Sequence, residues 1–285
     1  MMADRDLLPS SRIAILGLGL MGGSLALALR GRCRELLAAD PDPHTRALAR
    51  QNQVVDIITD DPGSILPQAD VIVLAAPVEA ILDLLSTLPE LHPASAIVLD
   101  LGSSKVRICQ AMENLPARFD PVGGHPMCGK ERLGLSNADP RLYRGAAFAF
   151  TPLERTSDRV REFASQLAQA VGARPLWLDA AAHDRWVAAT SHLPYLVSSA
   201  LVMATPLEAA PLVGPGFRSA SRLASTPHSM MSSVLVSNQD EVLAALRLVR
   251  GQLDLLEACL ASGDTGALNR LLQASQIRQR ELVSA

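Results

Sequence analysis

The sequence predicts an α/β fold, a doubly wound parallel sheet followed by an all-helical C-terminal domain. From Arg12 to about Leu178, short and almost continuously apolar runs alternate with amphipathic stretches. This alternation is typical of a parallel sheet whose two faces are both covered by helices. After Asp179 the strand-like runs stop and long helical patterns follow. The length of 285 residues favours two domains, and we expect residues 1–178 to form the first and residues 179–285 the second.

Each predicted strand is a short apolar run, and each predicted helix has apolar residues at helical spacing. The strands are Ile13–Leu16, Leu36–Ala39, Val71–Ala75, Ile97–Leu99, Phe148–Thr151 and Pro175–Leu178. The helices between them are Ser24–Arg30, His44–Gln51, Val78–Leu85 and Asp158–Val171. The later helices are Ala180–Thr205, Gly216–Ala224, Met230–Ala261 and Leu268–Ser284. Asp179 is the expected N-cap of the first later helix. The segment Asn238–Asp240 either continues the third of these helices or divides it, and both alternatives stay open.

The composition argues against a protein that binds nucleic acid. Lys and Arg number 26 against 29 Asp and Glu, which gives a net charge of −3, and no basic block occurs. The aromatic residues are only five Phe, two Tyr and two Trp. Because nucleic-acid binding needs clustered cations for phosphates and often aromatic faces for bases, we expect no nucleic-acid partner.

The cysteines indicate neither a zinc site nor a disulfide framework. They are widely separated, without a Cys-x-x-Cys pair or a close Cys/His pair, at Cys33, Cys109, Cys128 and Cys259. We therefore expect no bound metal and a reducing, cytoplasmic environment. The first ten residues include Asp4, Arg5 and Asp6 and do not resemble a signal peptide.

One long apolar stretch is interpreted as a buried helix and not as a membrane span. Trp186–Leu207 contains no Asp, Glu, Lys or Arg, but it contains His192, Pro194, Pro206 and several Ser and Thr residues. The core of a domain or of a dimer accommodates such polar groups better than a bilayer does. We expect no membrane contact.

A glycine-rich turn follows the first predicted strand and leads into a helix. The segment reads Gly17-Leu18-Gly19-Leu20-Met21-Gly22. In a Rossmann-type fold, Gly17 permits the tight turn, Gly19 lets the backbone approach a pyrophosphate, and Gly22 lets the helix pack on the strand. The N–H groups at the start of that helix then face the anion. The segment is therefore the predicted cofactor-binding loop.

Asp40 is the predicted ligand of the cofactor ribose. It closes the second strand, and such an acid follows a dinucleotide-binding turn by about 20 residues. Its carboxylate would accept hydrogen bonds from the ribose hydroxyls and repel a 2′-phosphate, while the nearest following arginine is Arg46. This predicts NAD and not NADP. The alternative makes Asp40 a helix cap for His44–Gln51.

Two further loops are candidates for the functional site. Ala75-Ala76-Pro77 ends the third predicted strand, at the crossover that lies beside the cofactor in a doubly wound sheet; an ordinary loop is the alternative. Gly123–Gly129 is expected to be a tight loop that presents His125, with the backbone restrained by the next residue, a proline. A histidine so placed can take a proton near neutral pH, although a loop histidine is more often a simple turn residue.

Taken together, the motifs resemble those of the prephenate/arogenate dehydrogenases of tyrosine biosynthesis. The resemblance extends from about Arg12 to the final helices. It rests on the combination of motifs, because many dehydrogenases share the glycine loop alone. The matching segments are Gly17–Ser24, Asp100–Lys105, Gly123–Gly129, Ser191–Pro194 and Gly216–Arg222.

The resemblance implies an NAD-dependent oxidative decarboxylation. In this family a hydride leaves C4 of a cyclohexadienol for the nicotinamide, the ring carboxylate departs as CO2, and the ring becomes aromatic. His125 matches the residue that accepts the hydrogen of the 4-hydroxyl group, and Ser103 matches a residue that hydrogen-bonds to that group. The substrate is expected to be prephenate or arogenate.

The resemblance also implies residues that hold the substrate. Arg222 matches the arginine that binds a substrate carboxylate, and Arg218 matches a frequently basic position. Independently of the family, residues four apart share a helix face, and planar guanidinium groups suit carboxylates; a solvated basic face is the alternative. His192 is implied to line the site, whereas a buried histidine bonded to the backbone is the alternative.

The sequence departs from the family pattern at two positions. Cys128 stands where alanine is frequent, which is a small-for-small change, and Tyr195 stands where many members have a second histidine. The second change removes any relay or substrate role expected of that histidine. Lys105 matches a family lysine and Lys130 follows the histidine loop, but we assign neither a chemical step.

Two other functions are compatible with the same cofactor domain. A reductase of the β-hydroxyacid type usually has a catalytic lysine in its helical domain, but the two lysines here lie no further than residue 130. A non-catalytic dinucleotide sensor would not need His125, Ser103 and Arg222 around the cofactor. The uncharged stretch Trp186–Leu207 and the family resemblance predict a homodimer formed through the helical domain.

Overall fold

The computed structural model describes residues 7–130 and 132–284. Asp4, Arg5 and Asp6, which were the reason to expect no signal peptide, lie outside the described residues. The chain divides into two compact units, residues 1–238 and residues 239–285. Each unit is described by itself.

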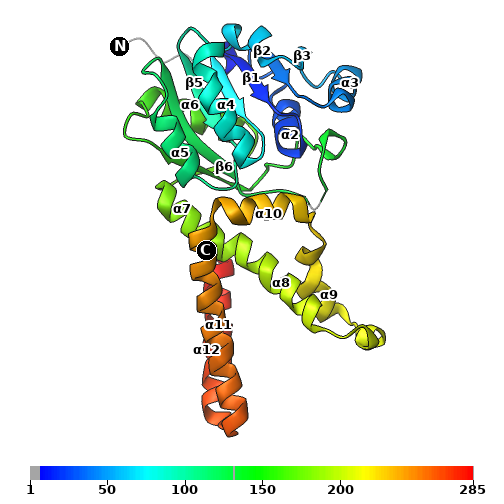
Figure 1. The fold of residues 1–285 in the computed structure, drawn as a ribbon. Coiled ribbons are helices and arrows are strands. Elements are labelled where there is room, and N and C mark those ends of the chain that lie inside the picture. The colour runs from blue at the N-terminus through cyan, green and yellow to red at the C-terminus, as the bar shows by residue number, and fades with distance from the viewer. Residues whose placement is uncertain (1–6, 131, 285) are drawn as a thin grey trace. The chain divides into compact units, whose positions relative to one another are not determined.

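The first unit is built on one eight-stranded sheet with the order β3-β2-β1-β4-β5-β6-β7-β8 (Figure 1). Six neighbouring pairs are parallel, and only β6 and β7 are antiparallel. The strands are β1 (Arg12–Leu16), β2 (Glu35–Ala39), β3 (Ile57–Thr59), β4 (Val71–Leu74), β5 (Ala96–Asp100), β6 (Phe119–Pro126), β7 (Ala147–Pro152) and β8 (Arg174–Trp177). The order from β3 to β6 is that of a doubly wound sheet, so the Rossmann-type prediction is confirmed.

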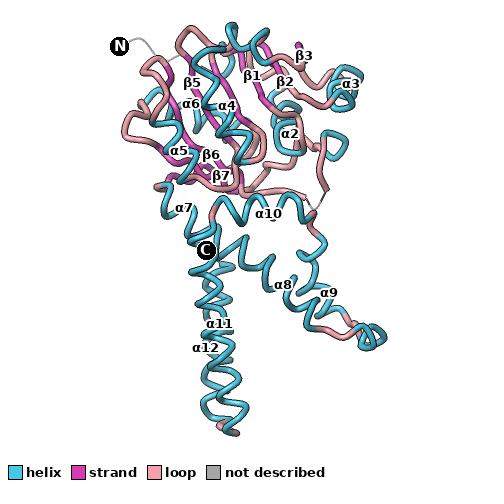
Figure 2. The backbone as a smooth tube through the Cα atoms, in the orientation of Figure 1, coloured by secondary structure: helices cyan, strands magenta, loops and turns pink. Residues whose placement is uncertain are grey.

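Helices cover both faces of this sheet (Figure 2). The α-helices are α1 (Leu7–Ser10), α2 (Leu20–Leu29), α3 (Pro43–Gln51), α4 (Val78–Leu91), α5 (Val106–Glu113), α6 (Asp158–Ala170), α7 (Ala180–Val187), α8 (Leu193–Ala204), α9 (Pro215–Ser221) and α10 (His228–Ser237). Alternate strand residues point to opposite faces, so Ile13 and Ile15 pack with α2, α3 and α6, while Ala14 and Leu16 pack with α4 and α5. Burial on both faces explains why the strands are apolar at successive positions.

Short helical turns occupy several of the connections. They are η1 (Pro62–Ser64), η2 (Leu66–Gln68), η3 (Leu135–Asn137), the π-helical η4 (Ala188–His192), η5 (Leu207–Leu212) and η6 (Arg222–Ser225). The predicted boundary at residues 178–179 falls between β8 and α7. The division into one domain of residues 1–178 and a second of residues 179–285 stays a prediction.

The structure corrects the prediction that His125 lies in a tight loop. Gly123, Gly124, His125 and Pro126 form the end of β6, and His125 pairs with Ala149 of β7. Glycine and proline are depleted in strands, which is why this segment did not look like one. Antiparallel pairing of these four residues with β7 overrides that local preference, and β5 pairs with the preceding part of β6, Phe119–Val122. The short strand β3 was missed as well.

The long apolar stretch forms one continuous helical rod made of α7, η4 and α8. It spans Ala180–Ala204 and is, among the described helices, the one long and apolar enough to cross a membrane by length and composition. The same test is passed by core helices of soluble proteins. Its N-terminal end is polar and buried against the sheet unit, as shown below, and its N-cap is Asp179, whose side chain accepts the backbone N–H of Ala182.

Asn238 ends α10, so the third late helical pattern is divided and not continuous. Its backbone has φ −129° and ψ 34°, which are not helical values. Its side chain donates a hydrogen bond of 2.7 Å to the main-chain oxygen of Asp184. This contact between distant segments resolves the alternative that the sequence left open.

The second unit is a helical hairpin of α11 (Gln239–Ser262) and α12 (Thr265–Ser284). Gly263 turns the chain with φ +68°, a conformation that favours glycine. Asp264 accepts the backbone N–H of Ala267 at 2.8 Å and caps α12. Both helices expose large apolar side chains, among them Leu248 and Leu282.

Candidate functional site

The glycine-rich turn lies at the carboxyl end of β1, where the strand order reverses between β1 and β4. Gly17 has φ +99°, and a Cβ there would lie 2.5 Å from the main-chain oxygen of Ala75. The turn is therefore pressed against the loop that follows β4, which contains Ala75, Ala76 and Pro77. In open α/β sheets, ligands bind at such a switch point.

The other two glycines of the turn differ in their surroundings. A Cβ on Gly22 would lie 2.0 Å from the main-chain oxygen of Gly17, whereas a Cβ on Gly19 would meet nothing within 4 Å. Helix α2 begins at Leu20, with Gly19 as its N-cap, four residues before its predicted start. The open space beside Gly19 and the free N–H groups of Leu20 and Met21 fit the pyrophosphate of a dinucleotide.

Asp40 lies at the end of β2, buried beside this turn. One carboxylate oxygen accepts the backbone N–H of Leu18 at 2.7 Å, and the other accepts that of Asp42 at 2.9 Å. The N-cap of α3 is Asp42, so the alternative that made Asp40 the helix cap is wrong. Arg46 donates hydrogen bonds to the main-chain oxygens of Asp40 and Pro41 and forms an ion pair with Asp60.

A buried ion pair holds the strand that carries His125. Asp100, at the end of β5, pairs with Lys105, and both side chains are fully buried. Lys105 also donates to the main-chain oxygen of Gly124 at 2.7 Å, while Asp100 accepts the N–H of Gly124 at 3.0 Å. Both polar groups of the residue before His125 are thereby fixed. Ser103 is partly exposed in the loop between these two charges.

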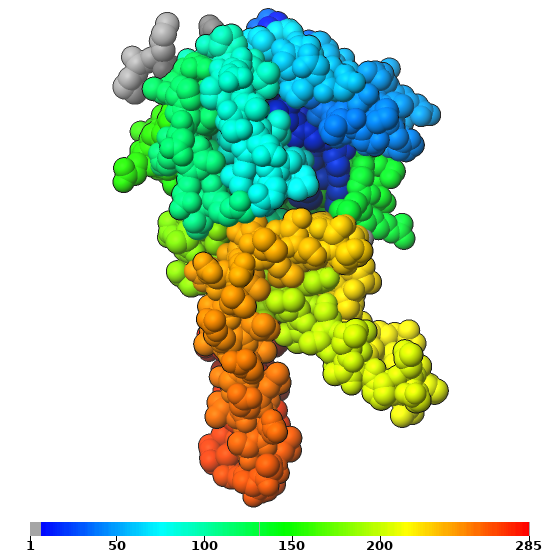
Figure 3. All heavy atoms as spheres, in the orientation of Figure 1, coloured from blue at the N-terminus to red at the C-terminus, as the bar shows by residue number. Residues whose placement is uncertain are grey.

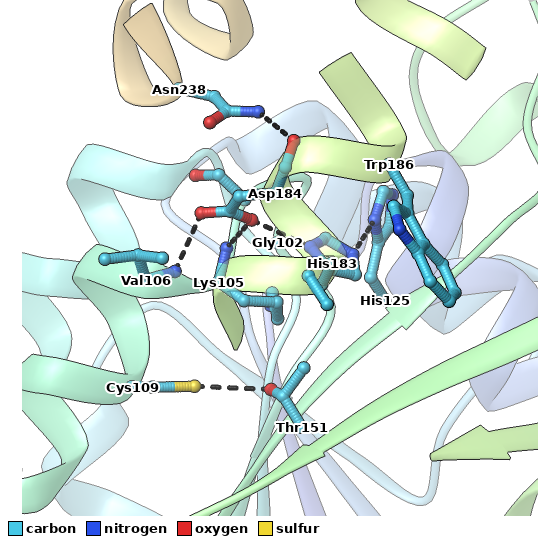
Figure 4. Close-up of polar contacts among 12 residues, drawn as sticks. Gly102, Lys105, Val106, Cys109, His125, Thr151, His183, Asp184, Trp186 and Asn238 are labelled. Atoms are coloured by element: carbon cyan, nitrogen blue, oxygen red, sulfur yellow. Dashed lines mark hydrogen bonds and ion pairs between the residues drawn. The ribbon is translucent and has the colours of Figure 1, made fainter. Parts of the chain in front are cut away.

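His183 and Asp184, on α7, complete a chain of hydrogen bonds behind His125 (Figure 4). Nδ1 of His125 lies 2.9 Å from Nε2 of His183, and Nδ1 of His183 lies 2.7 Å from a carboxylate oxygen of Asp184. The same carboxylate accepts the backbone N–H groups of Lys105 at 2.6 Å and Val106 at 2.9 Å. Asp184 thus binds the N-terminus of α5, where a negative charge is favoured.

This chain of hydrogen bonds was not predicted from the sequence. His183 stands 58 residues after His125 and inside a helical pattern, so no spacing connects them. The available signal was the polar run His183-Asp184-Arg185 near the start of a largely apolar helical pattern. Two almost fully buried polar residues in such a helix need partners, and the sequence does not say which.

His192 lies at the end of the π-helical turn η4 and is buried. Its Nδ1 is 3.4 Å from the side-chain nitrogen of Asn238. Single π-turns inside α-helices occur frequently at functional sites. His192 also interacts electrostatically with His125 and His183, which places it in the same cluster. Its hydrogen-bond partner is the side-chain amide of Asn238, whereas the alternative expected a backbone partner.

The cluster lowers the pKa of two of its histidines, His125 and His192. Burial lowers the pKa of His125 well below its ordinary 6.5, with further lowering by the neighbouring His183, Lys105 and His192. Burial also lowers the pKa of His192 to about 4, against an opposing effect of Asp184. A neutral imidazole has one nitrogen with a lone pair, so His125 is able to accept a proton at pH 7. Among the described residues, no group of three His, Cys, Asp or Glu side chains is placed to hold a metal ion.

The two predicted substrate-binding arginines lie on a separate element. Arg218 is in α9, and Arg222 follows directly as the first residue of η6, with helical backbone angles; both side chains are exposed. Ser198 ties this segment to α8, because its hydroxyl donates to Ala220 and accepts from the N–H of Ala224. The arginines share a short helical segment, as predicted.

Comparison with known proteins gives a consistent result along the chain. A family model described as "Prephenate dehydrogenase, nucleotide-binding domain" matches residues 25–176, and one described as "Prephenate dehydrogenase, dimerization domain" matches residues 179–274. The prephenate dehydrogenase of Bacillus subtilis (strain 168) is 30% identical over 244 residues, which cover 81% of this chain and 65% of that protein. The chain thus spans slightly less than two thirds of that relative's length.

Two solved structures are similar over nearly the whole chain. The Synechocystis arogenate dehydrogenase is 30% identical with a TM-score of 0.84, and 95% of this chain and 99% of that chain are covered. The prephenate dehydrogenase from A. aeolicus, in complex with hydroxyphenyl propionate and NAD+, is 27% identical with a TM-score of 0.88. That comparison covers 97% of this chain and 99% of the other.

Proposed function

Because this chain belongs to the prephenate dehydrogenase family, we propose that it catalyses the NAD-dependent oxidative decarboxylation of prephenate or arogenate. The products are 4-hydroxyphenylpyruvate or tyrosine, together with CO2. Bound NAD supplies the nicotinamide that accepts the hydride from C4 of the substrate. The observation that carries the proposal is the bond between His125 and His183, because it leaves the second ring nitrogen of His125 for a substrate hydroxyl.

In this proposal His125 is the general base. Removing the proton of the 4-hydroxyl group lets the carbon that bears it lose a hydride, since the oxygen can then form a carbonyl. Loss of CO2 converts this carbonyl to a phenolate, which takes the proton back as the ring becomes a phenol. The lowered pKa of His125 keeps it in the form that accepts a proton. Ser103, on the neighbouring loop after β5, is proposed to hydrogen-bond the same hydroxyl.

The substrate carboxylates are assigned to the arginines. Prephenate carries two carboxylates, and Arg222 is proposed to bind one through a two-point contact of its guanidinium group. Arg218, exposed on the same short helical segment, adds a second positive charge. His192 is proposed to line the site, because it belongs to the cluster around His183.

The cofactor is proposed to lie along the turn Gly17–Gly22 and the loop Ala75–Pro77. Asp40 stands at the end of β2, where the ribose of the adenosine half is expected. A carboxylate there disfavours a 2′-phosphate, and Arg46 is engaged with main-chain oxygens and with Asp60. This arrangement supports a preference for NAD. A large preference for NADP in steady-state kinetics would contradict it.

We also propose that two chains form a homodimer through their helical regions. The second matching family model is described as a dimerization domain. Large apolar side chains are exposed on α8 and on the connection after it, including Met203 at 84%, Leu207 at 90% and Leu212 at 87%. Apolar surface of this kind marks protein interfaces. Light scattering at micromolar concentration tests the proposal, and a monomer there contradicts it.

The direct test supplies prephenate and NAD and follows the absorbance of the reduced cofactor. Formation of NADH and CO2 in equal amounts supports the proposed reaction. Prephenate and arogenate differ in a keto or an amino group on the side chain, so the ratio of their kcat/KM values identifies the preferred substrate. Binding of NAD without turnover of either acid would support a non-catalytic sensor instead.

A further inference from the structure

The bonds among His125, His183 and Asp184 determine the tautomers of both histidines. A carboxylate only accepts hydrogen bonds, so Nδ1 of His183 carries a hydrogen and donates it to Asp184. An imidazole with its one hydrogen on Nδ1 has its lone pair on Nε2, so Nδ1 of His125 donates to Nε2 of His183. The lone pair of His125 therefore lies on its Nε2 atom.

The surrounding charges favour a positive charge on His183 over one on His125. The ammonium group of Lys105 and the rings of His183 and His192 all oppose a cation on His125, and burial opposes it most. The carboxylate of Asp184 instead lies 2.7 Å from His183. A positive charge is therefore more stable on His183 than on His125, and one hydrogen bond connects the two rings.

We propose that His183, supported by Asp184, is the second member of a proton relay that begins at His125. This inference rests on the proposed function and assigns a further residue to it. The O–H bond of the substrate breaks as an N–H bond forms at Nε2 of His125. At the same time the N–H bond at Nδ1 of His125 breaks, and an N–H bond forms at Nε2 of His183. His125 ends neutral, and His183 ends as an imidazolium beside the Asp184 carboxylate.

The relay returns to its starting state when the ring becomes aromatic. Loss of CO2 leaves a phenolate at the 4-oxygen, and the same two transfers then run in reverse and return the proton from Nε2 of His125 to that oxygen. Asp184 does not itself take a proton. Its carboxylate stabilises the positive charge on His183, and it also binds the N-terminus of α5. For that reason the informative substitution is at His183, because replacing Asp184 would disturb a helix as well.

A matched pair of variants separates a relay from a merely orienting role. In His183→Gln an amide oxygen still accepts the N–H of His125 but cannot take its proton, whereas His183→Phe removes the acceptor too. The relay predicts that both variants lose kcat, on the order of 10²-fold, with little change in KM or in the Kd of NAD. Near-normal kcat in His183→Gln, with loss only in His183→Phe, overturns the relay.

The number of protons that transfer in the same step gives a second test of the relay. Rates in mixtures of light and heavy water should show two transferring protons in the native chain and one in His183→Gln. One proton in both overturns the inference. His92→Gln is the matched control, because His92 is a buried histidine bonded to Ala69 just before β4, at the opposite edge of the sheet. Its kcat should be unchanged.

The resting tautomers are measurable without any substrate. Spectra of ¹⁵N-labelled histidine at pH 7, assigned with the His125→Asn and His183→Gln variants, should show hydrogen on Nδ1 of both His125 and His183. Hydrogen on Nε2 of His125 overturns the relay whether or not the chain turns over prephenate. Absence of turnover with the expected tautomers would count against the proposed function alone.

Discussion

The cofactor turn and the histidine cluster are built in opposite ways. The turn Gly17–Gly22 is one short segment whose function depends on backbone groups and on the absence of side chains. The cluster joins His125 on β6, His183 on α7 and His192 on η4, and it works through side chains alone. The first is local in sequence, and the second exists only because distant elements pack together.

The difference shows where each region is sensitive to change. At the turn, added atoms are harmful, because backbone must approach backbone at Gly17 and Gly22. In the cluster, removed atoms are harmful, because each buried polar group has a partner that would be left unsatisfied.

Removing the base of the cluster should have the largest effect. His125→Asn should lower kcat about 10²–10⁴-fold, because proton transfer by a placed side chain contributes that much. The Kd of NAD should stay the same, since the cofactor turn belongs to another part of the sheet edge. Steady-state kinetics and an NAD titration measure the two quantities. Unchanged turnover would remove His125 from the mechanism.

Replacing the carboxylate-binding arginine should act mainly on substrate binding. Arg222→Gln should raise KM for prephenate about 10–100-fold, because hydrogen bonds between charged groups contribute about 1.5–3 kcal/mol. The matched control is Arg174→Gln, an exposed arginine on β8, which should leave KM unchanged. Equal KM values for Arg222→Gln and the native chain contradict the assignment.

The cofactor turn should distinguish two glycines that look equivalent in sequence. Gly22→Ala should lower the free energy of unfolding by about 1–3 kcal/mol, because its Cβ would overlap backbone. Gly19→Ala should leave unfolding unchanged without cofactor but weaken NAD binding, because its Cβ enters the open space. Thermal unfolding with and without NAD measures both. Equal unfolding of the two variants would mean that the turn does not pack as described.

Acid should destabilise the native chain through His192, with a smaller effect. The pKa of His192 is about 4 when folded and about 6.5 when unfolded, so the unfolded chain binds more protons between these values and stability falls as pH falls. From pH 6.5 to pH 5 the loss from this group is about 1.5 kcal/mol. The groups that face it are Asp184, His183 and Asn238.

A variant at this position isolates the contribution. His192→Asn should lose less stability than the native chain over the same pH interval, measured by urea unfolding at each pH. Parallel pH profiles for the two proteins would show that His192 is not the group responsible. The difference between the two profiles is the relevant quantity because His125, whose pKa is also lowered by burial, contributes in the same direction.

The fold was largely predictable because its signals are local. Apolar runs and helical spacing indicated six of the strands and most helices, and the turn after β1 identified the nucleotide-binding edge. The prediction was wrong at β6, where Gly123, Gly124 and Pro126 obscured a strand. Pairing with β7 and the ion pair of Asp100 and Lys105 decide the backbone of these residues, and such long-range contacts produce no periodic pattern in the sequence.

The α/β class, the cofactor turn with Asp40 and the candidate base His125 could all be identified in the amino-acid sequence. The residues behind that base, the reason why α10 ends at Asn238 and the acid that caps α3 became clear from the packed structure. The physical reason is the range of the interactions. Backbone turns and helix periodicity depend on residues a few positions apart, whereas His183 and Asp184 meet His125 and Lys105 only after the helical rod packs against the sheet.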